Sequence, residues 1–281
     1  MADSVVVRVP ASSANLGPGF DSFAAALALH CEVEVVKTGS FSVVTDLKIA
    51  TDRKNLVVRA FEKITPPDEY EFRIKSTIPL SGGLGSSAAA VIAGLLAARE
   101  FVTNLSDPVA AAAEIEGHPD NAAAALHGGF VICSGERVTT LKAPPNLSAV
   151  LVVPHKAVRT KEARAALKKK VPLSDAVYNL SQAASLALGI ERGDLGLISE
   201  SLGDHLHQPY RASLYPDAAE LSCSVKDFGA LGGTISGAGP TVLVWCEAGT
   251  EDGIAKRLQS EAAGWADVVR TTFEPQGAQV S

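Results

Sequence analysis

The chain has 281 residues, of which 47% are hydrophobic and 20% charged, and its formal net charge is −6 at pH 7. This length can form one large domain or two moderate ones, and the balance is that of a globular protein rather than a disordered one. The mild negative charge gives no reason to expect a nucleic acid or a membrane surface as a partner.

Four cysteines stand far apart at Cys31, Cys133, Cys223 and Cys246, and no CxxC pair occurs. We therefore expect neither a disulfide framework nor a cysteine metal site, which fits a reducing compartment. The first residues show no basic segment followed by an apolar stretch, and no apolar run reaches membrane-spanning length. These features predict a cytoplasmic location.

Apolar patterning predicts the first elements in chain order. Strands are expected at residues 5–9, ended by Pro10, at 31–36, at 41–44 as a partner of 31–36, at 70–78 and at 129–133. Helices are expected at residues 55–64, at 88–98, and from an N-cap at Asp107 through Pro108 to Glu116. Because residues 88–98 are apolar on every side, that helix should be fully buried.

The segment at residues 143–146 contains two prolines and is the best candidate for a domain boundary, which would separate residues 1–146 from 147–281. Beyond it, strands are expected at 149–153, 241–246 and 267–273, and helices at 160–167, 174–188, 194–202, 218–228 and 251–262. A glycine-rich loop should occupy 229–239. Strands and helices mix without a regular βαβ rhythm, which predicts an α+β fold with antiparallel sheets.

Residues 79–89 have the sequence PLSGGLGSSAA and lie between a predicted strand and the predicted buried helix. Glycines permit positive φ and close backbone approach, so the loop amides can converge on an anion at the helix N-terminus. The two serines can cap the helix or bind Mg²⁺. The chain contains no Gly-Lys pair, which excludes a Walker A loop. The alternative is a tight strand-to-helix turn, but the loop's length and three glycines favour phosphate binding.

This loop resembles the second of three motifs shared by the GHMP kinases. Residues 231–241, LGGTISGAGPT, are similar to the third motif, and residues 9–21, VPASSANLGPGFD, resemble the first in its homoserine kinase form. The resemblance covers nearly the whole chain. It implies a two-domain fold, with an N-terminal domain like the second domain of ribosomal protein S5, a ferredoxin-like C-terminal domain, and an active site between them.

Three further segments are similar to homoserine kinases: HPDN at 118–121, TKEAR at 160–164 and HQPYR at 207–211. The resemblance implies transfer of the γ-phosphoryl of ATP to the hydroxyl of L-homoserine, which yields O-phospho-L-homoserine on the way to threonine. Homoserine is a zwitterion. Arg164 and Arg211 could therefore bind its carboxylate as bidentate forks, and Asp21 could pair with its amine.

The resemblance assigns the other site residues. Asn15 and Asn121 would hold the hydroxyl, and His118 and Thr160 would also face the substrate. The residues expected to contact ATP are Asn55, Pro79, Ser81, Gly82, Gly83, Leu84, Gly85, Ser86, Ser87, Gly237, Ala238 and Gly239.

Mg²⁺ is implied as well, with one serine and one glutamate as ligands, and the matching residues are Ser87 and Glu114. Only three residues separate Glu114 from His118, so Glu116 is an alternative ligand. In a helix these two glutamates point to different faces, and only one should face the site. Asp120 is the only carboxylate we nominate as a general base, and direct attack by the substrate hydroxyl is the alternative.

Several of these residues also have a purely structural interpretation. Arg164 could be a solvated helix residue, Asp21 and Asn55 could be helix N-caps, and His207 could be a structural histidine. Two other functions stay open: a GHMP kinase for threonine, shikimate or mevalonate, and a non-catalytic ATP-binding sensor. Relatives commonly form homodimers, although no feature of the sequence marks a dimer surface.

Overall fold

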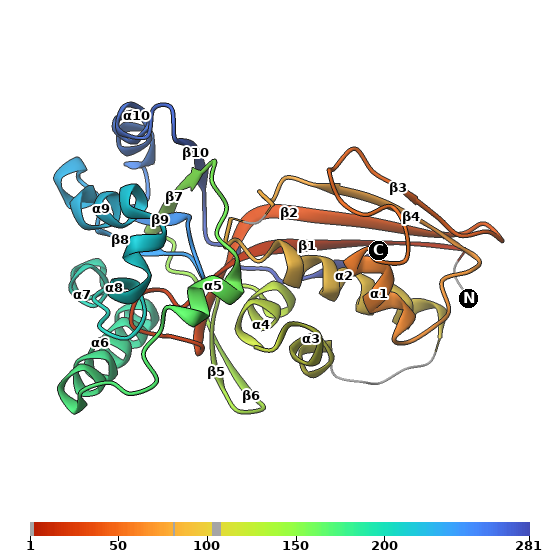
Figure 1. Cartoon of the computed structure of the whole chain (residues 1–281), viewed down its shortest axis with the longest axis horizontal. Coiled ribbons are helices and arrows are strands. Elements are labelled where there is room, and N and C mark those ends of the chain that lie inside the picture. Colours follow the sequence, from red (N-terminus) through yellow and green to blue (C-terminus); the bar gives the residue numbers. More distant parts are fainter. Residues whose placement is uncertain (1–2, 81, 103–107) are drawn as a thin grey trace.

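The computed structural model describes residues 3–80, 82–102 and 108–281, and the side chain of Glu116 lies outside this description. Two sheets lie side by side along the long axis of the molecule (Figure 1), and helices cover them. The mixture of antiparallel sheets and packed helices confirms the predicted α+β fold class.

The N-terminal sheet is built around two long antiparallel strands, β1 and β2. Its strand order is β11-β1-β2-β4-β3, and β5 pairs with both β2 and β6. The strands are β1 (Ser4–Ala14), β2 (Phe23–Lys37), β3 (Ser42–Val44), β4 (Tyr70–Ser76), β5 (Phe130–Ser134), β6 (Arg137–Leu141) and β11 (Gln279–Val280).

Two strand predictions were wrong. Pro10 does not end β1, because the register with β2 shifts between Pro10 and Ala11 and this irregularity accommodates a residue that has no amide hydrogen. The strand predicted at residues 41–44 does not pair with β2, whose edges are taken by β1 and β4. It is β3, and it pairs in parallel with β4.

Four helices pack near this sheet: α1 (Leu56–Glu62), α2 (Ser86–Phe101), α3 (Pro108–Glu116) and α4 (Asp120–His127). The alanine-rich helix α2 is buried over most of its length and packs on β1, as the sequence predicted. The α4 helix was not predicted, and the proposed N-cap Asp107 lies outside the described residues. Both α2 and α4 begin at motif residues, so the predicted site residues Ser86, Ser87, Asp120 and Asn121 lie on their first turns.

The second sheet has the order β10-β7-β9-β8, and all its strand pairs are antiparallel. It contains β7 (Leu147–Pro154), β8 (Gly232–Ile235), β9 (Val242–Glu247) and β10 (Ala266–Thr271). This part of the chain also contains α5 (Thr160–Ala165), α6 (Leu173–Arg192), α7 (Leu195–Glu200), α8 (Gln208–Arg211), α9 (Pro216–Ser224) and α10 (Glu251–Glu261), with short 3-10 turns at Ala212–Leu214 and Val225–Phe228. β8 occupies part of the predicted loop at 229–239, which is therefore shorter than expected.

One of the apolar clusters joins the two sheets. Phe130 of β5 packs on Trp245 of β9 and on Phe273, with ring centroids 5.9 and 4.7 Å apart. The strand β11 pairs with β1, so residues near the C-terminus lie in the N-terminal sheet. The domain division after residue 146 stays a prediction. Within the described residues, no helix combines the length and apolar character needed to span a bilayer.

Candidate active site

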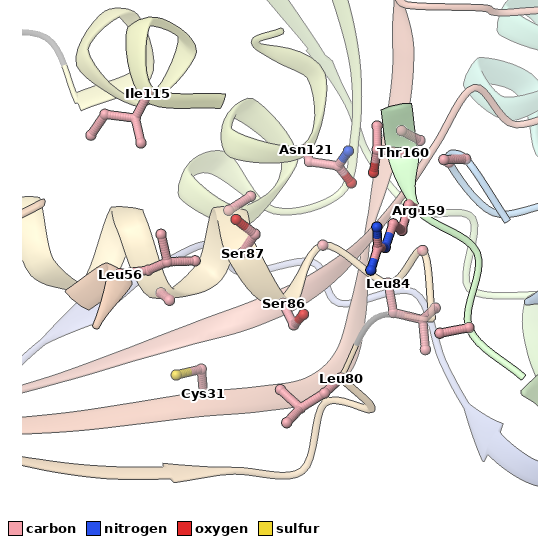
Figure 2. A pocket seen from close by; sticks show the side chains of 18 of the residues that line it. Cys31, Leu56, Leu80, Leu84, Ser86, Ser87, Ile115, Asn121, Arg159 and Thr160 are labelled. Atoms are coloured by element: carbon pink, nitrogen blue, oxygen red, sulfur yellow. The ribbon is translucent and has the colours of Figure 1, made fainter. Parts of the chain in front are cut away.

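All three sequence motifs contribute to one cavity of about 940 Å³. Apolar side chains line one part of its wall, and Figure 2 shows Cys31, Leu56 and Leu80 there. Lys48, Lys54 and Arg59 also line the cavity. Ser86 and Ser87 lie in the middle, and Asn121, Arg159 and Thr160 lie toward the other part. That second part is charged, because Asp21, His118, Asp120, Arg164 and Arg211 also line it. The volume and the mixed lining suit a small-molecule site.

The glycine loop between β4 and α2 requires glycine at two positions that line the cavity. Gly83 and Gly85 have φ values of +80° and +65°, which side-chain-bearing residues rarely adopt. A Cβ on Gly85 would collide with Ser12 Oγ and crowd Asn121 Oδ1. The N-cap residue of α2 is Gly85, and among the described residues no side chain caps this helix, so its first amides and its dipole can face an anion.

The third motif holds the first two in place through hydrogen bonds between distant segments. Asn15 Nδ2 donates to the Gly237 carbonyl at 2.7 Å, and the Gly237 amide donates to the Ala14 carbonyl at 3.0 Å. Ser236 Oγ donates to the Gly83 carbonyl at 2.6 Å. These bonds fix the position of the glycine loop relative to Asn15, whose own φ of 71° lies in the left-handed region.

Arg211 is buried at the charged end of the cavity, with 2% of its surface exposed. Its Nε donates to the Ala163 carbonyl at 3.0 Å and its Nη1 to the Gly237 carbonyl at 3.1 Å. Within the described residues no carboxylate forms an ion pair with it, and burial lowers the pKa of its guanidinium. An anionic group of a ligand would therefore meet a positioned and unneutralised cation.

His207 lies beside Arg211 and is fully buried. Its Nε2 lies 2.8 Å from the Gly17 carbonyl, which can only accept, so Nδ1 is left as the acceptor for Arg211 Nη1 at 3.3 Å. Burial and the Arg211 charge lower the pKa of His207, while Asp204 opposes this shift. The neutral histidine thus positions the guanidinium, in agreement with its structural interpretation.

We expected Asp21 and Arg164 to bind opposite ends of a zwitterion. In the structure both line the cavity, and their side chains are hydrogen-bonded to each other. Their hydrogen bonds raise the pKa of Arg164. The Asp21 amide donates to Asn15 Oδ1 at 3.0 Å, which orients the residue in its left-handed conformation with φ of 53°. Arg164 is thus no freely solvated helix residue, and neither residue is a helix N-cap.

Phe20 does not line the cavity but contacts two arginines that do, which was not predicted from the sequence. Its ring lies 5.4 Å from the Arg211 guanidinium carbon and 5.9 Å from that of Arg164, and it stacks on His207 with centroids 5.3 Å apart. One aromatic ring thus contacts both predicted carboxylate-binding arginines. Its position between Gly19 and Asp21 in the first motif could have indicated this role.

The segment from His118 to Asn121 lies beside the glycine loop. Asp120 Oδ1 lies 2.9 Å from His118 Nδ1 and accepts from the Asn121 amide at 2.7 Å. Asn121 Oδ1 accepts from Ser12 Oγ at 2.9 Å, and Asn121 Nδ2 donates one hydrogen to Asp120 Oδ1 at 3.3 Å. The second hydrogen of Nδ2 is therefore the one that can be donated to a substrate oxygen. Asp120 has 2% of its surface exposed, yet lines the cavity and can face a substrate there.

Of the remaining predicted ATP contacts, Asn55, Leu84, Ser86, Ser87, Ala238 and Gly239 line the cavity, whereas Pro79 and Gly82 do not. Asn55 also caps α1, since its Oδ1 accepts from the Val57 amide at 2.9 Å. Ser81 lies outside the described residues.

The two predicted metal ligands differ in that only one of them lines the cavity. Ser87 lines the cavity, but Glu114 is exposed on α3 and does not line it, whereas its neighbour Ile115 does (Figure 2). The side chain of Glu116 lies outside the described residues. Glu114 therefore stays a prediction as a magnesium ligand.

Taken together, a glycine loop at a helix N-terminus, an apolar recess and a charged end define a small-molecule kinase that binds phosphates without a Walker lysine. The chain belongs to the GHMP kinase family. The model of the GHMP kinases N terminal domain matches residues 55–129, and that of the GHMP kinases C terminal domain matches 186–264.

Several relatives similar to the chain are homoserine kinases. Homoserine kinase of Moorella thermoacetica is 38% identical, covering 86% of this chain and 87% of its own. Homoserine kinase of Gloeobacter violaceus is 41% identical, covering 84% and 86%. The crystal structure of homoserine kinase from Cytophaga hutchinsonii superposes with a TM-score of 0.87 at 31% identity, covering 100% of this chain and 98% of that one. This likeness confirms the predicted GHMP kinase fold.

Proposed function

We propose that this protein is a homoserine kinase, which transfers the γ-phosphoryl of ATP to the side-chain hydroxyl of L-homoserine and forms O-phospho-L-homoserine, a step toward threonine. The observation that carries the proposal is the charged end of the cavity, where Asp21, Arg164 and Arg211 lie beside the glycine loop. The names and high coverage of the curated relatives support it.

The cavity divides the binding of the two substrates between its ends. The apolar recess near Leu56 suits the adenine ring, while the amides of Gly83 and Gly85 and the first turn of α2 suit the phosphates. At the other end, Arg211 would bind the amino acid carboxylate. Phosphoryl transfer depends mostly on positioning and charge, so the task of these residues is to bring the hydroxyl in line with the γ-phosphate.

Asn121 is suited to orient that hydroxyl, because its oxygen is held by Ser12 and its amide nitrogen can donate into the cavity. Asp120 is the proposed general base and lies on the same helix turn. Its Oδ1 is engaged by His118 and the Asn121 amide, which leaves Oδ2 to accept a proton from the substrate.

We propose Mg²⁺ as the second cofactor. When bound, the ion neutralises phosphate charge. The Ser87 hydroxyl in the cavity is a suitable hard ligand. Within the described residues, no cluster of three or more His, Cys, Asp or Glu side chains could hold a metal, so phosphate oxygens and water would supply most of its ligands.

Glu114→Gln should lower kcat strongly and Glu116→Gln should not. The reverse result would show that Glu116 is the ligand.

The deciding experiment measures ADP release from Mg·ATP by the purified protein with L-homoserine, L-threonine, shikimate, mevalonate or galactose. We expect turnover with homoserine at a sub-millimolar to millimolar KM and little turnover with the others. Clear turnover with another acid would overturn the proposed role of Asp21 but would leave the assignment of kinase activity intact. ATP binding without any turnover would instead favour the non-catalytic ATP-binding sensor.

A cytoplasmic location remains a proposal, supported by four cysteines that form no disulfide.

A further inference from the structure

Arg159 lines the cavity but belongs to none of the three sequence motifs. It lies in the segment between β7 and α5, immediately before Thr160, and it is exposed. Figure 2 shows its guanidinium pointing toward the middle of the cavity, where Ser86 and Ser87 lie. This cation is therefore directed at the region that separates the nucleotide end of the cavity from its charged end.

The local structure does not require an arginine at this position. Arg159 is the N-cap of α5, and its carbonyl accepts from the Glu162 and Ala163 amides at 3.0 and 3.1 Å, bonds that any residue could make. Its side chain forms no capping bond. N-caps favour Ser, Thr, Asp and Asn, whose side-chain oxygens accept from the first amides, and the positive end of a helix dipole disfavours a cation. The cavity, rather than the helix, accounts for the arginine.

The guanidinium of Arg159 is free to bind an anion. Within residues 3–80, 82–102 and 108–281 it has no hydrogen-bond or carboxylate partner. The other two arginines at the charged end are engaged, Arg164 by the Asp21 carboxylate and Arg211 by two backbone carbonyls. Of these three arginines, only Arg159 therefore offers all of its N–H donors to a ligand.

The chain around Arg159 lies between the glycine loop and the amino acid end. A Cβ on Gly82 would lie 3.6 Å from Val153 Cγ1, so the glycine loop packs on the end of β7, from which the chain continues to Arg159. Beyond Arg159, the helix α5 contacts Arg211 through the Ala163 carbonyl. An arginine between these two sites faces the place where the γ-phosphate of ATP must meet the acceptor hydroxyl.

The phosphate site lacks a cation of its own. The amides of the glycine loop and of the first turn of α2 are neutral donors, and the chain has no Walker lysine to bring a positive charge to the γ-phosphate. During phosphoryl transfer, negative charge is spread over the three equatorial oxygens of the moving group, and fixed cations that meet these oxygens lower the barrier. A guanidinium can bind two of them as a fork.

We propose that Arg159 binds the γ-phosphoryl group of ATP and stays bound to it during transfer. The bond from the γ-phosphorus to the bridging oxygen breaks, and its electron pair stays on ADP. The acceptor hydroxyl supplies the electron pair of the new P–O bond and gives its proton to Asp120. Arg159 forms no covalent bond and donates hydrogen bonds to the non-bridging oxygens throughout. The proposal rests on the proposed kinase function but not on which acceptor is phosphorylated.

The first test measures nucleotide binding in the absence of an acceptor. In calorimetric titrations, Arg159→Gln should raise the dissociation constant of the non-hydrolysable analogue Mg·AMP-PNP about 10-fold and leave that of Mg·ADP unchanged, because ADP has no γ-phosphate. Lys161→Gln is the matched control. Lys161 is also an exposed cation of α5 but does not line the cavity, so neither constant should change. Equal loss for both nucleotides, or no loss for either, would overturn the proposal.

The second test measures steady-state kinetics with L-homoserine. Arg159→Gln should lower kcat about 100-fold or more and change KM for homoserine less than about 3-fold. Arg159→Lys keeps the charge without the fork and should recover part of kcat. A loss confined to KM for homoserine would overturn the proposal and assign Arg159 to the amino acid carboxylate. A wild type that is inactive with every acceptor would contradict the proposed function instead, and the nucleotide titrations would still decide the role of Arg159.

Discussion

Arg164 donates two hydrogen bonds to the carboxylate of Asp21, from Nη1 to Oδ2 at 3.0 Å and from Nη2 to Oδ1 at 2.8 Å. The two residues carry the opposite charges that a zwitterionic amino acid requires. Such a substrate can exchange this ion pair for two new ones, its amine with Asp21 and its carboxylate with Arg164. A substrate with a carboxylate alone would separate the pair and leave Asp21 without a cation.

Asp21→Asn tests this exchange. The amide keeps the size of the side chain but cannot attract an amine as strongly, so KM for homoserine should rise about 10- to 100-fold while KM for ATP stays the same. Steady-state kinetics with each substrate varied in turn would measure both constants. Asp68→Asn is the matched control, because Asp68 also pairs with an arginine, Arg53, on the exposed surface. An unchanged KM for homoserine in Asp21→Asn would contradict the assignment.

Arg211→Ala should raise KM for homoserine about 100-fold and leave ATP binding nearly intact, because the guanidinium is the buried cation of the amino acid end. Arg211→Lys should recover little. A lysine cannot reproduce the fork that contacts the Ala163 and Gly237 carbonyls. Calorimetric titration with an ATP analogue would measure nucleotide affinity, and retained binding would also show that the variant is folded. Equal loss of ATP and homoserine binding would contradict this role.

Phe20→Leu should raise KM for homoserine about 5- to 30-fold at nearly constant kcat, because cation–π contacts to two guanidinium groups contribute about 1–2 kcal/mol. Phe20→Tyr retains the ring face and should restore the wild-type constant, provided its hydroxyl is accommodated. A simple packing defect would instead lower thermal stability in Phe20→Leu without a selective change in KM, so both quantities should be measured.

Gly85→Ala should reduce kcat/KM at least about 100-fold, because the new methyl group would displace Ser12 and Asn121 from the glycine loop. Gly135→Ala is the control. Its φ of +60° is close to the +65° of Gly85, but a methyl group there would meet nothing within 4 Å. In both variants alanine must adopt the left-handed backbone conformation, which lowers the free energy of unfolding by about 1–2 kcal/mol. Only the first should lose activity, and equal activity in the two would refute the close-packed loop.

Stability should fall as the pH drops below about 6.5, where an unfolded histidine gains a proton. Burial lowers the pKa of His207, so the folded state takes up this proton only at lower pH and the unfolded state binds more protons in between. His207→Gln can donate to Gly17 and accept from Arg211, and should flatten the dependence of the urea midpoint on pH. Burial also lowers the pKa of His30. The urea midpoint of His207→Gln should therefore keep a smaller dependence on pH, which comes from His30.

The sequence predicted those elements whose own residues determine them. The uniformly apolar helix α2 and the Asn55 cap of α1 are examples, because local pattern and local hydrogen bonding suffice. Pro10 misled the strand prediction, since only the partner strand reveals that a register shift accommodates it. The α4 helix was missed because it is only eight residues long and begins within the HPDN motif.

The site was predicted in its parts but not in its contacts. The motifs identified the cavity residues, because glycines, serines and charged residues stand at characteristic spacings. The ion pair of Asp21 with Arg164 joins residues 143 positions apart, and no local pattern encodes it. The platform role of Phe20 likewise depends on two arginines from distant helices. Such relationships follow from tertiary packing and become visible only in the folded molecule.

The hydrogen bond between Asn15 and Gly237 also bears on how the enzyme is made. It joins residues 222 positions apart, so the glycine loop cannot be fixed until most of the chain has left the ribosome. A nascent N-terminal half would contain two of the three motifs and still lack the contact that holds them together. Closing such a long loop is also slow. Catalytic competence should therefore appear late and all at once during synthesis.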